Sequence, residues 1–270
     1  MRRQAPAPLS LASRIDRVKL LTLARDLQRR RARERQQLFV VEGVRTVEEL
    51  LRSPITVHGV IVSPALTTPR GELLRAALAA SGVPILEVDE RDFASAASTE
   101  SPQGVMAIAH IPERDLASLT LRSSARILVL DGIQDPGNVG TIVRTAAAFG
   151  VAATLAMPGT VDLWNGKVVR SAMGALFHHP ALSCTWDELR RFLATSEIPL
   201  WGAAADGESL DAIEHATPPQ LAIVVGNEGA GLSPEASSHL ARKVAIRICP
   251  DVESLNVAVA TGILLHHFRA

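Results

Sequence analysis

The sequence predicts an α/β protein built from two domains, and three observations support this. Short apolar runs rich in β-branched residues alternate with stretches of helical periodicity along most of the chain, which is the pattern of strands and helices in turn. Residues 112–125 are polar and patternless by comparison and read as a linker. A length of 270 residues suits two domains, and a hydrophobic content of 47% is enough for two cores.

The first domain is expected at residues 14–111, behind a loose tail at residues 1–13 that contains Pro6 and Pro8. Its size and alternating pattern predict a small α/β unit. The first helix is basic, with an apolar side, and spans Arg14–Gln37. The expected strands are Leu38–Val41, Val57–Val62, Val83–Val88 and Gly104–Ile111, and the remaining helices are Val44–Leu51, Gly71–Ala80 and Arg91–Ala97.

The second domain is expected at residues 126–270 as a mainly parallel sheet covered by helices, because strands and helices alternate throughout. The expected strands are Arg126–Leu130, Ala152–Ala156, Leu182–Cys184, Leu200–Ala204, Leu221–Val225 and Val244–Ile248. The expected helices run from Asn138 or Val139 to Gly150, over Lys167–Ala175, over Trp186–Thr195, after Ser233, and from an N-cap at Ser254 to about Phe268.

Charge is neutral overall but unevenly distributed. Residues 1–35 hold eleven Lys and Arg against three Asp and Glu, a local charge of +8. The densest basic run contains Arg29, Arg30, Arg31, Arg33 and Arg35. Such a run is a candidate for phosphate contacts with RNA, and a solvated helix face is an equal alternative. Aromatic residues make up only 3%, so RNA binding through a large stacking platform is not expected.

Cysteine usage and hydropathy restrict the class of protein. Cys184 and Cys249 are the only cysteines and form no CxxC pair, so no metal site is expected. No apolar stretch reaches the roughly 18 residues of a membrane span. The N-terminus has Arg2 and Arg3 but no apolar signal core behind them. We therefore expect a cytoplasmic protein without a membrane partner.

Two polar loops near the C-terminus are candidate ligand sites. Leu221–Val225 reads as a buried strand and is followed by Gly226–Ser233, GNEGAGLS, whose glycines permit a tight loop. The strand expected at Val244–Ile248 is followed by the polar segment Glu253–Asn256. Strand ends of α/β sheets are where ligands usually bind, although each loop alone is compatible with an ordinary strand–helix turn.

A third loop, Asp131–Gly140, raises the alternative of a dinucleotide-binding fold. Its spacing is not GxGxxG, and the strand expected after it, Ala152–Ala156, ends without an acidic residue to bind a ribose. A P-loop is excluded as well, because Gly166 and Lys167 are followed by Val168 rather than Ser or Thr.

The three loops together resemble motifs of a known family. LDGIQDPGNVGTIVRTAAAFG (130–150), GNEGAGLS (226–233) and VESLNVAVATGILLH (252–266) are similar, in this order, to the first, second and third motifs of the SpoU (TrmH-like) RNA ribose 2′-O-methyltransferases of the SPOUT superfamily. FVVEGVRTVEELL (39–51) and SPQGVMAI (101–108) resemble the ribosomal-protein-like substrate-binding domain found in many of these enzymes. Glu42 lies in this second resemblance, and a helix-start carboxylate is an equal alternative for it.

This resemblance implies a fold, a cofactor and a site. The fold would be a SPOUT domain with a trefoil knot, acting as a homodimer. S-adenosylmethionine would be held mostly by main-chain atoms at Gly226, Ile246 and Leu255, with Asn227 beside them. The implied catalytic residues are Asn138, Arg144, Glu228, Ser254 and Asn256. Because Arg is effectively never deprotonated, we interpret Arg144 as a clamp for the target phosphate, with water or Glu228 accepting the proton.

The expected substrate is RNA, with ribosomal RNA of the large subunit favoured because of the N-terminal domain. Three alternatives remain: a tRNA 2′-O-methyltransferase, a non-catalytic ribosome-assembly factor on the same fold, and a Rossmann-like oxidoreductase. The chain departs from the family pattern at Arg247, where Pro is common, and at Asp251, where Gly is common. Either change affects the shape of the cofactor loop, and neither removes an assigned side chain.

Overall fold

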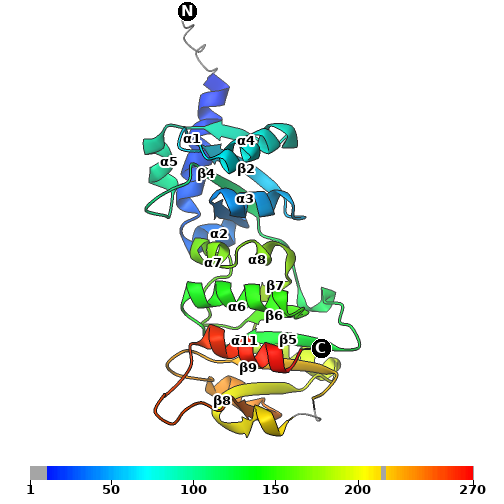
Figure 1. Cartoon of the computed structure of the whole chain (residues 1–270). Coiled ribbons are helices and arrows are strands. Elements are labelled where there is room, and N and C mark those ends of the chain that lie inside the picture. The colour runs from blue at the N-terminus through cyan, green and yellow to red at the C-terminus, as the bar shows by residue number, and fades with distance from the viewer. Residues whose placement is uncertain (1–10, 214–216, 270) are drawn as a thin grey trace, which may run out of the picture. The chain divides into compact units, whose positions relative to one another are not determined.

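The computed structural model describes residues 11–213 and 217–269, with side chains from Lys19 onward. The tail expected at residues 1–13 lies mostly outside this range. The chain forms two compact units, Met1–Ile111 and Pro112–Ala270 (Figure 1). No helix among the described residues has both the length and the apolar character needed to cross a membrane.

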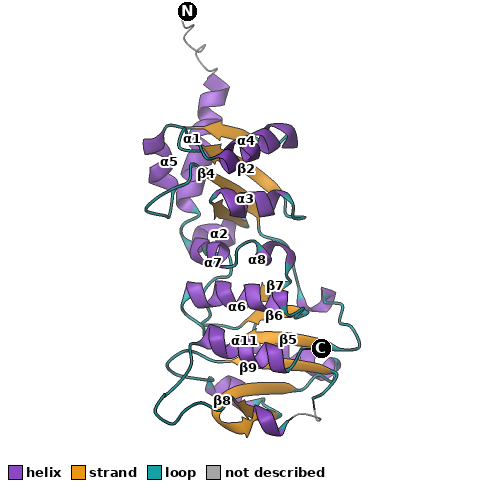
Figure 2. Ribbon diagram, in the orientation of Figure 1, coloured by secondary structure: helices purple, strands orange, loops and turns teal. Residues whose placement is uncertain are grey.

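The first unit is a four-stranded sheet with helices (Figure 2). Its strands are β1 (Leu38–Glu42), β2 (Val57–Val62), β3 (Ile85–Glu87) and β4 (Val105–His110), in the order β1-β4-β2-β3. β4 is antiparallel to both β1 and β2, whereas β2 and β3 are parallel. The helices are α1 (Leu11–Asp26), α2 (Arg30–Gln36), α3 (Val44–Leu51), α4 (Pro69–Ser81) and α5 (Glu90–Ala96).

The single helix expected over Arg14–Gln37 is wrong, because the chain turns after Asp26. Arg29 N donates to Asp26 O at 3.0 Å, a tight turn that ends α1. Arg33, only 3% exposed, donates to the carbonyl oxygens of Leu27 and Gln28 at 2.7 and 3.0 Å. Carbonyl groups at a helix end lack helical partners, and this buried guanidinium supplies one.

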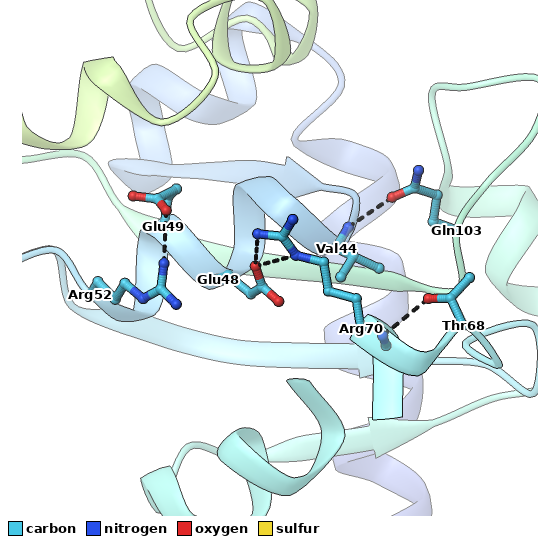
Figure 3. A network of polar contacts seen from close by, with 8 residues as sticks. Val44, Glu48, Glu49, Arg52, Thr68, Arg70 and Gln103 are labelled. Atoms are coloured by element: carbon cyan, nitrogen blue, oxygen red, sulfur yellow. Dashed lines mark hydrogen bonds and ion pairs between the residues drawn. The ribbon is translucent and has the colours of Figure 1, made fainter. Parts of the chain in front are cut away.

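Polar contacts hold α3 at its start and in its middle (Figure 3). Val44 N, at the start of α3, donates to Gln103 Oε1 at 2.9 Å. One turn later, Arg70 Nε of α4 donates to Glu48 Oε2 at 2.7 Å. This hydrogen bond lowers the pKa of Glu48 below its usual value, so the carboxylate keeps its charge. The two contacts connect α3 to segments that lie 59 and 22 residues further along the chain.

The second unit contains the six-stranded parallel sheet that the sequence predicts. Its order is β10-β8-β9-β5-β6-β7, and every pairing is parallel. The strands are β5 (Ala125–Leu130), β6 (Ala153–Ala156), β7 (Ala181–Ser183), β8 (Leu200–Ser209), β9 (Gln220–Val225) and β10 (Arg242–Ala245). β5 and β9 are buried along their apolar length, as parallel strands covered on both faces require.

The helices of this unit are α6 (Pro136–Ala148), α7 (Gly166–Ser171), α8 (Ala175–His178), α9 (Trp186–Thr195), α10 (Pro234–Ser238) and α11 (Val257–His267), with 3-10 turns at Leu116–Ser118 and Leu210–Ala212. The helix expected over Lys167–Ala175 is interrupted, because Met173 and Gly174 have φ of 51° and 87°. The C-terminal helix α11 packs beside α6 (Figure 1).

Three further boundaries differ from the expectation. The stretch expected as a linker packs on the second unit, since Leu116, Leu119 and Leu121 contact its core. β10 ends at Ala245, so Ile246 begins a loop instead of continuing a strand. The N-cap of α11 is Asn256 rather than Ser254, because the Asn256 side chain accepts from Ala258 N at 2.9 Å.

Candidate functional site

The candidate site lies where β5 and β9 end together. These two strands are neighbours in the sheet, and their last residues, Leu130 and Val225, pair directly. The loops that follow, Asp131–Asp135 and Gly226–Leu232, therefore leave the same edge of the sheet side by side. The carboxyl edge of a parallel sheet is the usual ligand position in this class of fold.

Asn227 shapes the loop after β9 and joins it to the loop after β5. Its Oδ1 accepts from Gly229 N and Ala230 N at 3.0 Å each, and its Nδ2 donates to Gly132 O at 2.8 Å. Gly226 allows the loop to fold back tightly, because a Cβ at this position would lie 2.3 Å from Gly231 O. The predicted cofactor residues Gly226 and Asn227 thus set the loop's conformation.

A second connection between the two loops uses a residue that the sequence analysis missed. Asp131 is 4% exposed, and its Oδ2 accepts from Ser233 N at 2.7 Å. Ser233 is the N-cap of α10, as expected, with its side chain accepting from Ala236 N. The available sequence signal was an acidic residue directly after a buried strand, where a buried carboxylate needs hydrogen-bond donors.

Asn138 brings three predicted catalytic residues together. Its Nδ2 donates to Glu228 Oε1 at 2.9 Å, and its Oδ1 accepts from Asn256 Nδ2 at 3.0 Å. Asn138, Glu228 and Asn256 follow β5, β9 and β10, respectively. Glu228 and Asn256 lie 90 and 118 positions after Asn138 in the sequence. Asn138 stays at the first turn of α6 because Asp135, the N-cap, accepts from its backbone N–H at 2.8 Å. We call Asn138, Glu228 and Asn256 the polar triplet.

The segment from Ile246 to Leu255 has peptide groups that remain available. All residues of this segment are described, and one main-chain hydrogen bond forms within it, from Val252 N to Cys249 O at 3.0 Å. Ile246 and Leu255 are half-buried, whereas Ser254 is exposed and makes no recorded contact with the polar triplet. Peptide groups without hydrogen-bond partners among the described residues are suited to bind a ligand with many donors and acceptors.

Arg144 is not brought to the polar triplet. It lies on α6 six residues after Asn138, which corresponds to about 9 Å along the helix and about 120° around it. The side chain is exposed, and no described residue forms a hydrogen bond or ion pair with it. Its guanidinium is therefore free to bind a group from outside this chain.

The basic run in the first unit divides into three kinds of arginine. Arg33 is buried against main-chain carbonyls, which corrects its expected role in RNA binding. Arg30 Nε donates to Glu34 Oε1 at 2.7 Å, so its charge is partly compensated. Arg29, Arg31 and Arg35 are exposed, and no partner is found for them among the described residues.

Glu42 in the first unit has a structural role. It is 6% exposed, and its carboxylate accepts from Ser98 N at 3.1 Å and from the hydroxyls of Ser98 and Thr99. The carboxylate therefore holds the loop after α5 against the end of β1. A role as a helix-start carboxylate is not observed, since Gly43 precedes α3 without a side-chain cap.

Two surface hollows lie beside α9. One is lined by residues such as Leu193 and His239, the other by residues such as Arg114 and Cys184. Neither includes a member of the polar triplet. We therefore place the site by its polar contacts.

Two family models match this chain. The model of the "SpoU rRNA Methylase family" matches residues 125–266, and the model of the "MRM3-like substrate binding domain" matches residues 17–107. The chain belongs to the SpoU rRNA methylase family. It is therefore an RNA ribose 2′-O-methyltransferase, and S-adenosylmethionine is its methyl donor. The Rossmann-like oxidoreductase alternative is wrong.

Relatives match both units of this family member. The 23S rRNA (guanosine(2553)-2′-O)-methyltransferase RlmP of Bacillus subtilis is 33% identical over 90% of this chain and 93% of its own. A putative TrmH-family RNA methyltransferase from Porphyromonas gingivalis aligns with a TM-score of 0.78 and 31% identity over 97% of this chain and 99% of its own. An AdoMet-bound rRNA methyltransferase from Sinorhizobium meliloti aligns with a TM-score of 0.82 and 26% identity over 97% and 96%.

Asn227→Ala should weaken S-adenosylmethionine binding at least tenfold, because three hydrogen bonds that shape the loop after β9 are lost. Titration calorimetry on the purified protein measures this. Asn165→Ala is the matched control: Asn165 caps α7 by accepting from Lys167 N, and none of its hydrogen bonds among the described residues is with the loop after β9. Equal cofactor affinity in the two variants would contradict the assigned role of Asn227.

Proposed function

We propose that this enzyme methylates the 2′-hydroxyl of a ribose in ribosomal RNA of the large subunit, acting in the cytoplasm. The observation that carries the proposal is the polar triplet, which collects one residue from each family motif at the edge of the sheet. The choice of large-subunit RNA is supported by the similarity to RlmP, whose full name specifies 23S rRNA. The match to a substrate-binding domain at residues 17–107 also supports it. A tRNA substrate is the alternative.

The cofactor is proposed to bind the loops after β9 and β10. S-adenosylmethionine supplies an activated methyl group on a sulfonium, and this chemistry belongs to the cofactor. The open peptide groups at Ile246 and Leu255 and the tight turn at Gly226 suit a ligand recognised through main-chain atoms. The charged and polar side chains of the triplet are then left for the RNA.

The protein's own part in the reaction is to orient the ribose hydroxyl and to take its proton. Glu228 is exposed and needs only one oxygen for Asn138, so its carboxylate or a water beside it can accept the proton. Asn138 fixes the direction of Glu228 through its hydrogen bond, and Asn256 in turn orients the Asn138 amide. Ser254 lies two residues before Asn256 and is proposed to contact the ribose.

Arg144 is proposed to bind the phosphate next to the target ribose. Its exposed guanidinium has no partner within the described chain, and its planar donors match phosphate oxygens in pairs. A separation of about 9 Å along α6 from Asn138 is compatible with a neighbouring position of an RNA strand. The positive charge also favours ionisation of the nearby hydroxyl.

Arg144→Ala should reduce methyl transfer at least a hundredfold with S-adenosylmethionine affinity unchanged, because Arg144 makes no hydrogen bond or ion pair with the described residues of the cofactor loops. Transfer of labelled methyl groups to RNA from cells that lack the gene measures the rate, and nuclease mapping then identifies the nucleotide. Arg144→Lys keeps the charge without the planar fork, so a small residual rate is expected with an unchanged pH profile.

A new basic limb in the pH–rate profile of Arg144→Lys would contradict the role as a phosphate clamp and favour a role as general base. Wild-type activity in Arg144→Ala would remove Arg144 from the site. If the wild-type protein binds RNA and cofactor but transfers no methyl group to any RNA, that result would instead favour the alternative of a non-catalytic ribosome-assembly factor.

Neutralising Arg29, Arg31 and Arg35 together to Gln should weaken RNA binding and flatten its salt dependence. Each lost phosphate contact lowers the slope of log affinity against log salt by about 0.7 to 0.9. Fluorescence anisotropy at several salt concentrations measures the slope. Arg190→Gln is the control, because this exposed arginine of α9 already pairs with Asp187 at 3.1 Å. An unchanged slope in the triple variant would make the run a solvated helix face.

We infer a homodimer and the trefoil knot from family membership, and one surface of α11 supports the dimer. Val259 and Ile263 are one turn apart on α11 and are 53% and 39% exposed. Exposed apolar side chains at this spacing form a stripe, which is typical of a helix that packs against a partner. α11 lies beside α6, so a second copy on this stripe would approach the helix that carries Arg144.

Replacing Val259 and Ile263 with Asp should convert the dimer to a monomer, since two charges would be buried at the interface. Light scattering after size-exclusion chromatography measures the mass. Leu73→Asp is the control, because Leu73 is 72% exposed on α4 in the other unit and should leave the mass unchanged. A double variant that remains dimeric would place the interface elsewhere.

A further inference from the structure

Arg126 is a buried cation with no carboxylate partner among the residues that the structure describes. It is the second residue of β5 and is 7% exposed. Its Nε donates to Phe268 O, and its Nη1 donates to Pro219 O at 2.7 Å and to Ala125 O at 3.0 Å. Burial lowers the pKa of Arg126 below its usual value. A buried charge is costly, so its hydrogen bonds to three carbonyl groups are essential.

These carbonyl groups belong to the ends of three different elements. Ala125 begins β5, Pro219 directly precedes β9, and Phe268 is the C-cap of α11. Phe268 and Pro219 are 142 and 93 residues from Arg126 in the sequence. The guanidinium therefore joins segments that the chain connects only through long intervening stretches.

The opposite ends of the same three elements carry the polar triplet. β5 leads through its loop to Asn138, β9 leads to Glu228, and α11 begins directly after Asn256. Six strand residues span about 20 Å, and the eleven residues of α11 span about 16 Å. Arg126 and the polar triplet thus lie at opposite ends of elements of similar length.

The position of α11 along its own axis decides whether the triplet forms. Asn256 caps α11 through Ala258 N and Val259 N, so its side chain moves with the helix. The bond from Asn256 Nδ2 to Asn138 Oδ1 is 3.0 Å long, and a shift of about 1 Å along the axis would break it. At the other end, Phe268 is 1% exposed and its ring packs edge-on against Trp201 at 5.6 Å.

We propose that Arg126 is a positioning residue for methyl transfer. By binding the C-terminal carbonyl of α11 and the starts of β5 and β9, it sets the axial register of α11 and thereby holds Asn256 within reach of Asn138. Arg126 does not touch the reacting groups. The inference rests on the proposed role of the polar triplet and extends the site to a residue at the far end of the sheet.

Arg114 provides a matched control for this proposal. It is a half-buried arginine that likewise donates to main-chain carbonyls, those of His179 and Ala181, at 2.6 and 3.5 Å. Burial lowers the pKa of Arg114 as well. Its contacts, however, lie at β7 and the residues just before it, which carry no member of the triplet. If Arg126 had only a structural role, replacing it should affect methyl transfer no more than replacing Arg114 does.

The test compares Arg126→Met with Arg114→Met in the full-length protein. Both substitutions should lower the melting temperature, so rates are measured well below both transitions. Arg126→Met should reduce kcat at least tenfold and change KM for RNA less than twofold, while Arg114→Met keeps kcat within twofold of wild type. Arg126→Lys, which can reach part of the same carbonyl set, should recover part of kcat.

Hydrogen exchange supplies a readout that does not depend on activity. The amides of Ala258 and Val259 should exchange at least tenfold faster in Arg126→Met and not in Arg114→Met. Equal kcat in the two Met variants, or unchanged exchange at these amides, would overturn the proposal. Absence of methyl transfer in the wild-type protein would instead contradict the proposed function, and the exchange comparison would still test the contact.

Discussion

The pairing of β5 with β9 is the constraint on which the site depends. Both strands are buried and parallel, and their ladder ends with Leu130 opposite Val225. A slip of one residue would turn every side chain of one strand to the other face of the sheet. The register therefore delivers the loops after both strands to the same place, where Asn227 and Asp131 connect them through short hydrogen bonds.

Local hydrogen bonds then convert this edge into a defined arrangement of side chains. Asp135 holds the first turn of α6, and Asn256 caps α11, so each asparagine of the triplet is fixed by its own helix end. Helix N-termini also carry a partial positive charge, which favours the carboxylate of Glu228 near Asn138. The protein's own hydrogen bonds thus orient the side chains of the site, which lowers the cost of orienting a substrate.

The sequence predicts elements well where local chemistry decides them. Val44–Leu51, Val57–Val62 and Trp186–Thr195 have the expected boundaries, and the last of these begins with a capping box at Thr185. Contacts between distant segments decide the cases that sequence reasoning missed. The break after Asp26 depends on where Arg33 is buried, and the N-cap of α11 depends on which polar side chain reaches the helix amides.

Arginines show most clearly why site prediction from sequence is incomplete. Arg33, Arg126 and Arg144 carry the same charge, yet the first two are buried against main-chain carbonyls. The third is exposed, with no partner among the described residues. A guanidinium offers five donors, so it can satisfy several chain ends at once or bind phosphate in pairs. Burial separates the two uses, and burial is a property of the tertiary fold. A basic residue inside a strand, as Arg126 is in β5, is the pattern that signals the first use.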